Sequence, residues 1–220
     1  MNIFIIGAGG VSSYLVPCLK KLANLETITI IDGDVLEDRN LDRQLFSPRY
    51  IGQNKAVALS EMHGTKAIPY YLTEEMNLHP KEEDFFIVCV DNHKARRVAL
   101  DICDKARCWC IIGANEYTDS EAYIYQGYYW KGGSRDPRIR CPEIVTDNSN
   151  NPVSCQGEIL DHSPQLCIAN MLAASYILHL FYNWFSTGAL CEFENLPVWH
   201  RSNLFKINTL TISDIDKIYE

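Results

Sequence analysis

The sequence has few basic residues for a surface that would bind nucleic acid. Its 220 residues include 20 lysines and arginines against 28 aspartates and glutamates, which gives a formal net charge of −8. Binding to a phosphate backbone needs clustered lysines and arginines, and here they are scattered. The composition argues against a nucleic-acid partner. It leaves ATP open, because a helix N-terminus and one or two cations can hold a polyphosphate.

The nine cysteines include no C-x-x-C pair, and their number is odd. Structural zinc sites need four closely spaced ligands, so we expect no zinc. Reduced thiols are expected in an intracellular enzyme, and no basic leader precedes the first apolar run. The most apolar stretch, residues 164–185, is interrupted by Gln165, Asn170, His179 and Asn183. We therefore expect a cytoplasmic protein with no membrane span.

The order of apolar runs predicts a single α/β domain. A strand is predicted at 2–6, followed by a glycine-rich turn, a helix over 11–23 and a second strand at 27–31. This order is the first half of a doubly wound, Rossmann-like nucleotide-binding unit, so we expect a mixed sheet with helices on both faces. The remaining predictions are helices at 55–62, at 93–106 and from residue 164, and strands at 67–72, 85–90, 109–112, 122–129, 191–199 and 204–212.

Between residues 131 and 152 the composition changes to Gly, Ser, Asp, Asn and Pro, which predicts a long loop. We divide the domain into a nucleotide-binding core (1–130), a crossover loop (131–163), and a C-terminal helix with strands (164–220).

The glycine-rich turn lies where the first strand passes into the first helix. Gly7, Gly9 and Gly10 would let the backbone approach a phosphate, whose charge the helix N-terminus attracts. Asp32 ends the second strand, where an acidic side chain can bond a ribose hydroxyl. Ser12 stands where dehydrogenases have a third glycine. The pattern predicts nucleotide binding without naming the nucleotide, and a tight turn that binds nothing is the alternative.

The most specific segment runs from Asp32 to Gln44 as DGDVLEDRNLDRQ. It resembles the D-x-D-x-V-x-x-x-N-L-x-R-Q signature of the E1-like (ThiF) adenylyltransferases, with Leu36 in place of the valine. Two further family-like pieces follow in order, IGQNKA from Ile51 and CVDN from Cys89. Four motifs in the family's order make coincidence improbable.

The resemblance implies ATP- and Mg²⁺-dependent adenylation of the C-terminal carboxylate of a ubiquitin-like or sulfur-carrier protein, by a homodimer. Attack on the α-phosphate builds negative charge that cations stabilise. Arg43 can make forked contacts to phosphate, and Lys55 can act as a point charge. By resemblance, Asp91 would hold Mg²⁺. The residues implied at the nucleotide are Gly7, Gly9, Gly10, Asp32, Asp34, Asn40, Arg43, Gln44, Lys55, Asp91 and Asn92.

The alternative for these charged residues is structural. Arg43 and Lys55 would then be surface charges, and Asp91 would only cap the helix that begins at His93. The chain also begins at its first strand, without the N-terminal helix that in relatives delivers an arginine across the dimer. We expect another cation in that role, or slow turnover.

A cysteine follows the predicted loop, where some relatives carry the thiol that accepts the acyl group. Cys155 is our candidate, with Arg43, Lys55 and Asp91 as the other catalytic residues. A loop thiol with no task is an equal alternative for Cys155, and Cys141 is the second candidate. The remaining candidates are expected to be packing residues: Cys103, Cys108, Cys110 and Cys167.

Two other functions remain open at this stage. The enzyme could adenylate a peptide or a tRNA-linked small molecule instead of a protein. A different class would be an NAD-binding oxidoreductase or a non-catalytic nucleotide-binding subunit. Arg43 and Lys55 separate these classes, because a dehydrogenase has no use for cations around a γ-phosphate.

Overall fold

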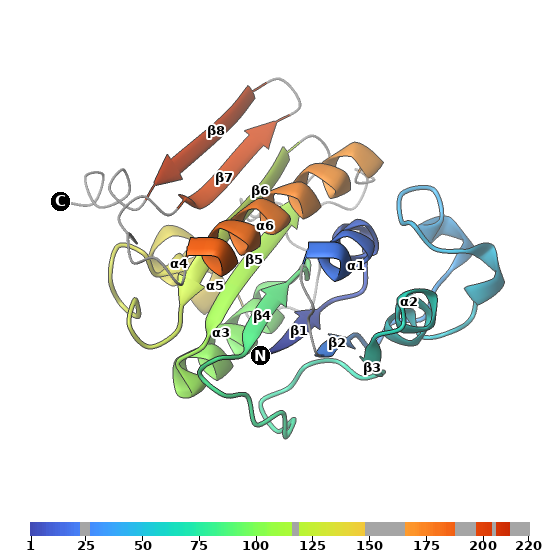
Figure 1. Cartoon of the computed structure of the whole chain (residues 1–220), viewed down its shortest axis with the longest axis horizontal. Helices are drawn as coiled ribbons and strands as arrows, with labels where there is room; N and C mark the ends of the chain where they lie inside the picture. Colours follow the sequence, from blue (N-terminus) through green and yellow to red (C-terminus); the bar gives the residue numbers. More distant parts are fainter. Residues whose placement is uncertain (23–26, 116–118, 148–165, 188–196, 204–205, 212–220) are drawn as a thin grey trace.

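The computed structural model describes residues 1–22, 27–115, 119–147, 166–187, 197–203 and 206–211. Its strands form one eight-stranded sheet in the order β3-β2-β1-β4-β5-β6-β7-β8 (Figure 1). The strands are β1 (Asn2–Ile6), β2 (Thr27–Ile31), β3 (Lys66–Ile68), β4 (Phe85–Val88), β5 (Trp109–Asn115), β6 (Asp119–Gln126), β7 (Pro197–Asn203) and β8 (Lys206–Thr211). The helices are α1 (Gly10–Leu22), α2 (Lys55–His63), α3 (His93–Ala106), α4 (Pro137–Arg140), α5 (Glu143–Thr146) and α6 (Cys167–Thr187), with 3-10 turns η1 (Asp38–Asn40) and η2 (Pro48–Tyr50).

The sheet is mixed. Strands β3, β2, β1, β4 and β5 run parallel, and β6, β7 and β8 add antiparallel neighbours at one side. The central parallel strands are mostly apolar, because helices cover both of their faces. Every residue of β4 is buried, as are Phe4, Ile5 and Ile6 of β1.

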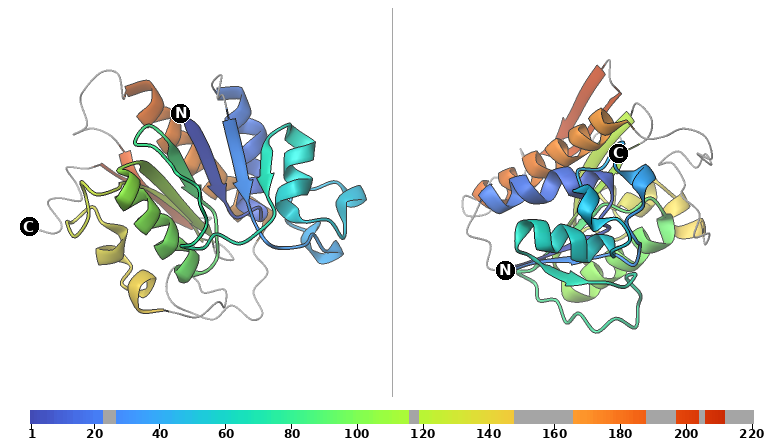
Figure 2. Two further views of the ribbon diagram at one scale, coloured as in Figure 1. Left: turned by 90° about the horizontal axis from the view of Figure 1, so that it is seen from below. Right: turned by 90° about the vertical axis from the view of Figure 1, so that its right-hand side faces the viewer.

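Helices pack on both faces of the sheet, as predicted. On one face, Leu15 of α1, Leu59 of α2 and Ile177 of α6 join one hydrophobic cluster. On the other face, Val98 of α3 and Ile144 of α5 join a second cluster. Figure 2 shows α1 and α6 on one side of the sheet and α3 with α5 on the other. The predicted fold class, a doubly wound Rossmann-like α/β domain, is confirmed.

The strand order creates a switch point between β1 and β4. From β1 the chain continues to β2 and β3 on one side, and then crosses over to β4 and β5 on the other. In open α/β sheets, ligands bind in the crevice outside the carboxyl ends of the strands at such a point. The glycine-rich turn after β1 and Asp91 after β4 both lie there.

The prediction of a long loop at 131–152 was wrong for the described residues of that range, because they include the short helices α4 and α5. Asp136 accepts a hydrogen bond from the Arg138 amide and caps α4, whose first residue is Pro137. The Arg138 side chain then fixes this turn on α3 and β6 through contacts with Asp101, Asp104 and the Tyr125 hydroxyl. Short-range composition does not reveal these long-range contacts.

Several boundaries also differ from the prediction. β3 ends at Ile68, since Pro69 follows it and cannot donate to the ladder. β6 ends at Gln126, before a turn in which Tyr128 has a φ of 69°. α6 begins at Cys167. Within the described part of the chain, no helix combines the length and the apolar character that a membrane crossing requires.

Candidate functional site

The turn after β1 requires glycine at its first position. Gly7 has a φ of 93°, and a Cβ there would lie 2.6 Å from the Cys89 carbonyl oxygen. The Gly7 amide donates to the Ile31 carbonyl at 2.9 Å, so the turn is tied to the end of β2. At Gly9, by contrast, a Cβ would meet no atom within 4 Å. The described residues thus leave the surface above Gly9 open, which is the surface that a phosphate would approach.

Asp32 shapes this turn from the end of β2. Its Oδ2 accepts the Ala8 amide at 2.5 Å, and its Oδ1 accepts the Asp34 amide at 2.7 Å. Burial raises the pKa of the carboxyl, although these two hydrogen bonds oppose the shift. Each carboxylate oxygen has two lone pairs, so Asp32 can still accept a hydroxyl hydrogen bond.

Lys55 is held beside Asp34 at the N-terminus of α2. Its Nζ lies 3.1 Å from Asp34 Oδ2, and the residue is only 9% exposed. Asn54 caps α2 by accepting the Val57 amide, and its own amide donates to the carbonyls of Asp32 and Asp34 at 2.9 and 3.0 Å. The alternative that Lys55 is a surface charge was wrong, because these contacts draw it into the site.

Tyr71 is a site residue that the sequence reasoning missed. Its hydroxyl donates to Asp34, and its ring lies against Gly33, where a Cβ would be 2.7 Å from the ring. That hydrogen bond raises the pKa of Tyr71 to about 12, with smaller contributions from the charges of Asp32 and Asp91. Burial alone would raise the pKa of Asp34, but the contacts with Tyr71 and Lys55 outweigh it and lower the pKa.

Arg43 and Gln44 present buried polar atoms that no described residue pairs with. They follow η1, where the Asn40 side chain accepts the Glu37 amide in a capping box. Within the described ranges, Arg43 Nε and Gln44 Oε1 are buried and have no hydrogen-bond partner. An unpaired buried polar group costs about 1–3 kcal/mol. A ligand with both acceptor and donor groups would remove that cost.

Asp91 lies on the exposed edge after β4 and does not cap α3. The cap is Asn92, whose Oδ1 accepts the Ala95 amide at 2.8 Å. The alternative that Asp91 is only a helix cap was therefore wrong. Among the described residues, no group of three histidines, cysteines or acids could hold a metal by itself. Mg²⁺ commonly binds through one or two carboxylates together with substrate phosphates, and a single exposed Asp91 fits that arrangement.

The described cysteines differ in how deeply they are buried. Cys103, Cys108 and Cys110 are buried, as predicted, whereas Cys167 is exposed, so its prediction as a packing residue was wrong. Burial raises the pKa of the Cys141 thiol, and the Glu121 charge adds to the shift. The reactive thiolate is thus disfavoured at Cys141. Cys155 lies outside the described residues.

Comparisons with known proteins place the chain in a family. The ThiF family model matches residues 1–211. No curated protein sequence matches the chain.

Among solved structures, E. coli MccB superposes with a TM-score of 0.67 at 19% identity, covering 96% of this chain and 62% of MccB. PaaA gives a TM-score of 0.67 at 15% identity, covering 96% and 64%. E. coli MccB with ATP gives 0.64 at 18% identity, covering 96% and 64%. At these identities the likeness shows a shared fold, and the chain spans less than two thirds of each of these proteins.

Proposed function

The chain belongs to the ThiF family, and from this premise we propose that it is an ATP-dependent adenylyltransferase that activates a C-terminal carboxylate. The observation that carries the proposal is the pairing of an open glycine turn with two cations, Arg43 and Lys55. Arg43 keeps a buried Nε without a partner among the described residues, and Lys55 is drawn inward by Asp34. An NAD-binding oxidoreductase would have no use for cations placed around a γ-phosphate, because NAD has none.

In the proposed reaction, a carboxylate oxygen of the partner attacks the α-phosphorus of ATP. A new P–O bond forms, the bond between the α-phosphorus and the bridging oxygen breaks, and pyrophosphate leaves. The turn at Gly7 and Gly9 would hold a phosphate against the N-terminus of α1, and Asp32 would accept the ribose hydroxyl. Arg43 and Lys55 would stabilise the negative charge on the phosphates, with Asn40 and Gln44 as neutral neighbours.

Asp91 would hold Mg²⁺, which neutralises phosphate charge when it is bound. In this proposal Asp91 is a ligand and not a cap, so its removal should not affect the fold. Asp91→Ala should lower the adenylation rate by roughly a hundredfold, as loss of one transition-state charge contact commonly does. Unchanged activity in a folded variant would remove Asp91 from the site. Asn92→Ala is the contrasting variant for stability, because Asn92 caps α3 and its loss should lower the melting temperature, whereas Asp91→Ala should not.

Exchange of radiolabelled pyrophosphate into ATP tests the reaction. We expect exchange only when ATP, Mg²⁺ and the carboxyl-bearing partner are all present, because the reverse reaction needs the acyl-adenylate. Affinity for NAD with no measurable affinity for ATP would contradict the proposal.

We propose a ubiquitin-like or sulfur-carrier protein as the carboxyl donor. The support is the Asp32–Gln44 signature, which this chain shares with activators of such proteins. Pull-down with the purified protein and ATP, followed by mass spectrometry, tests this step. A captured protein with a C-terminal glycine would support it.

A peptide is the second candidate for the carboxyl donor. Its support is that the similar structures include MccB, described as a microcin C7 biosynthetic enzyme, in complex with N-formylated MccA. The two donors differ in size, so separating them requires only the same exchange assay with a carrier protein and with synthetic C-terminal peptides. Exchange driven by a short peptide alone would favour the second candidate.

Transfer of the acyl group to Cys155 is a separate step of the proposal. The adenylate carbonyl would be attacked by the thiolate, AMP would leave, and a thioester would remain. Its support is the position of Cys155 ahead of the apolar helix α6. A reductant-sensitive adduct that disappears in Cys155→Ser, with pyrophosphate exchange intact, would support this step. Accumulation of the adenylate without an adduct would show that the reaction stops there.

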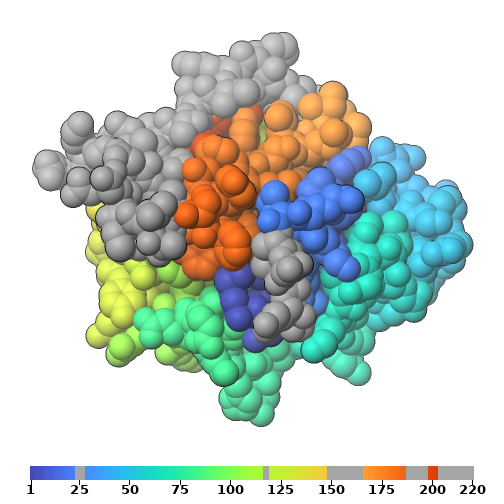
Figure 3. All heavy atoms as spheres, viewed as in Figure 1, coloured from blue at the N-terminus to red at the C-terminus, as the bar shows by residue number. Residues whose placement is uncertain are grey.

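We also propose that the protein is a homodimer. Its support is a row of exposed apolar side chains on α6: Ile168, Met171, Tyr182 and Phe185. Figure 3 shows α6 (orange) beside α1 (blue) on this face of the molecule. Light scattering of the wild type and of Met171→Glu tests it, and a monomeric wild type would contradict it.

A further inference from the structure

Asn170 is a buried polar residue on the otherwise apolar helix α6. Its side chain is fully buried, and a buried amide needs hydrogen-bond partners. Its Nδ2 donates to the Arg43 carbonyl at 3.0 Å, and its Oδ1 accepts from Asn115 Nδ2 at 3.0 Å. The donor contact on one side and the acceptor contact on the other fix the orientation of the amide.

The same amide lies against the N-terminus of α1. A Cβ on Gly10 would overlap the Asn170 side chain, so the two residues are complementary in shape. Asn170 therefore touches the start of the helix after the glycine turn, the Arg43 segment, and Asn115 at the carboxyl end of β5. These three parts come from distant positions in the sequence.

The Arg43 segment is also held by Phe46, which is buried in the hydrophobic cluster that contains Leu15 of α1. Ser13 Oγ accepts the Leu45 amide at 2.9 Å, and the Asn40 carbonyl accepts the Arg43 amide at 3.3 Å. The guanidinium keeps a buried Nε without a described partner. The backbone of Arg43 is thus held from α1 and α6, while its side chain is left available. Holding a binding group in place before the ligand arrives reduces the ordering cost of binding.

We propose that Asn170 is a positioning residue for Arg43, fixing its backbone so that the guanidinium meets the β- and γ-phosphates of ATP. This role rests on the proposed function. It also explains why Gly10 lacks a side chain, since a methyl group there would displace the amide.

The test compares the binding of ATP with that of AMP, which lacks the β- and γ-phosphates, by calorimetry on the full chain. In Asn170→Ala, we expect the affinity for ATP to fall roughly tenfold and the affinity for AMP to change less than about twofold. A merely structural role would weaken both ligands equally. Equal weakening, or unchanged ATP affinity in a folded variant, would overturn the role.

Tyr176→Phe is the matched control, because it removes another buried hydrogen bond of α6, from the Tyr176 hydroxyl to Ser202 Oγ at 2.7 Å. It should lower the melting temperature without changing the ratio of ATP to AMP affinity. Should Asn170→Ala not fold, Asn170→Leu decides, because it removes the Nδ2 donor to the Arg43 carbonyl without leaving a hole beside Gly10. An unchanged ratio in that variant would overturn the role.

A double-mutant cycle then asks whether Asn170 acts through Arg43. In an Arg43→Ala background, Asn170→Ala should leave ATP affinity unchanged, whereas additive losses would overturn the role. A wild type that binds no ATP would instead overturn the proposed function, and this role with it. That outcome is recognised before any variant is made.

Discussion

Arg43 and Arg138 are two partly buried cations that differ in what surrounds them. Arg138 has a side chain 10% exposed and pairs with Asp136 at 2.9 Å, Asp101 at 3.1 Å and Asp104 at 3.0 Å. Burial would lower the pKa of its guanidinium, but the contacts with Asp136 and Asp104 outweigh it and raise the pKa. Arg43, in contrast, has a buried Nε that no described residue accepts from.

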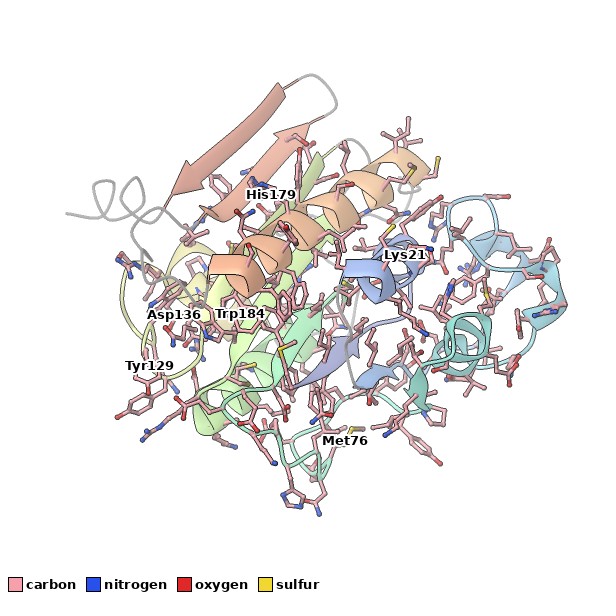
Figure 4. All side chains as sticks on the ribbon, viewed as in Figure 1. Lys21, Met76, Tyr129, Asp136, His179 and Trp184 are labelled. Carbon is pink, nitrogen blue, oxygen red and sulfur yellow. The ribbon has the colours of Figure 1, made fainter. Side chains whose placement is uncertain are left out.

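The difference separates a structural cation from one that we propose to bind a ligand. Arg138 holds α4 against α3 and β6. Figure 4 labels Asp136, the residue of this cluster that caps α4. Every described contact of Arg138 is internal, so nothing is left for a ligand to satisfy. The Arg43 segment is held by its backbone through Asn170, which leaves its guanidinium available.

Removing Arg138 should have the largest effect, and the effect should be on stability. Arg138→Ala takes away the cation that the buried carboxylates of Asp104 and Asp136 share, so we expect the free energy of unfolding to fall by about 3–5 kcal/mol. Urea unfolding measures it. Arg39→Ala is the control, because its ion pair with Glu37 is exposed and should contribute less than about 1 kcal/mol. If Arg138→Ala and Arg39→Ala lost similar amounts of unfolding free energy, Arg138 would not be a structural cation in this sense.

Removing Arg43 should reverse this pattern. Arg43→Ala should lower pyrophosphate exchange by roughly a hundredfold, because one cation is lost from the phosphates in the transition state. Its melting temperature should change little, since no described residue depends on the guanidinium. Arg49→Ala is the matched control, because Arg49 lies in the same segment but is exposed and contacts Tyr50. A strongly destabilised Arg43→Ala would place Arg43 with Arg138 as a structural cation.

The Arg138 cluster should also respond to acid. Burial would raise the pKa of Asp104, but contacts with Tyr125, Arg138 and Lys131 outweigh it and lower the pKa. Because the folded-state pKa lies below the unfolded one, its stabilisation is present above about pH 4 and is lost as the pH falls through the folded value. Asp104→Asn should be less stable than the wild type at pH 7 and should lose less stability on acidification. If the free energies of unfolding of the wild type and of Asp104→Asn fell in parallel between pH 7 and 3, the prediction would be contradicted.

Tyr71→Phe should have the smallest effect of the four. It removes one hydrogen bond to Asp34 at an exposed position, so stability should fall by less than about 1 kcal/mol. The ring stays on Gly33, and Lys55 keeps its contact with Asp34, so ATP affinity should change less than about threefold. A larger loss of affinity would mean that the Tyr71 hydroxyl itself takes part in the site. Titration with ATP by calorimetry measures it.

Much of the site could be predicted because its residues lie in local motifs. Gly7 has a positive φ, which favours glycine, and Asp32 directly follows a short run of β-branched residues. Both positions can therefore be recognised from their sequence neighbours. Asn54 and Lys55 both belong to the short IGQNKA motif that begins at Ile51. Tyr71 could not be found in this way, because its contact with Asp34 spans 37 residues of chain and no pattern surrounds it.

The sequence by itself determined the parallel nucleotide-binding half. Buried parallel strands leave short apolar runs in the sequence, and a turn with a positive φ leaves a glycine. The tertiary structure alone decided how those parts meet. Asn170 reaches Arg43 across 127 residues, and Arg138 reaches Asp104 across 34. A buried polar group must find its partner wherever the fold brings one, so only the packed chain shows that Arg138 is paired and that Arg43 Nε has no partner among the described residues.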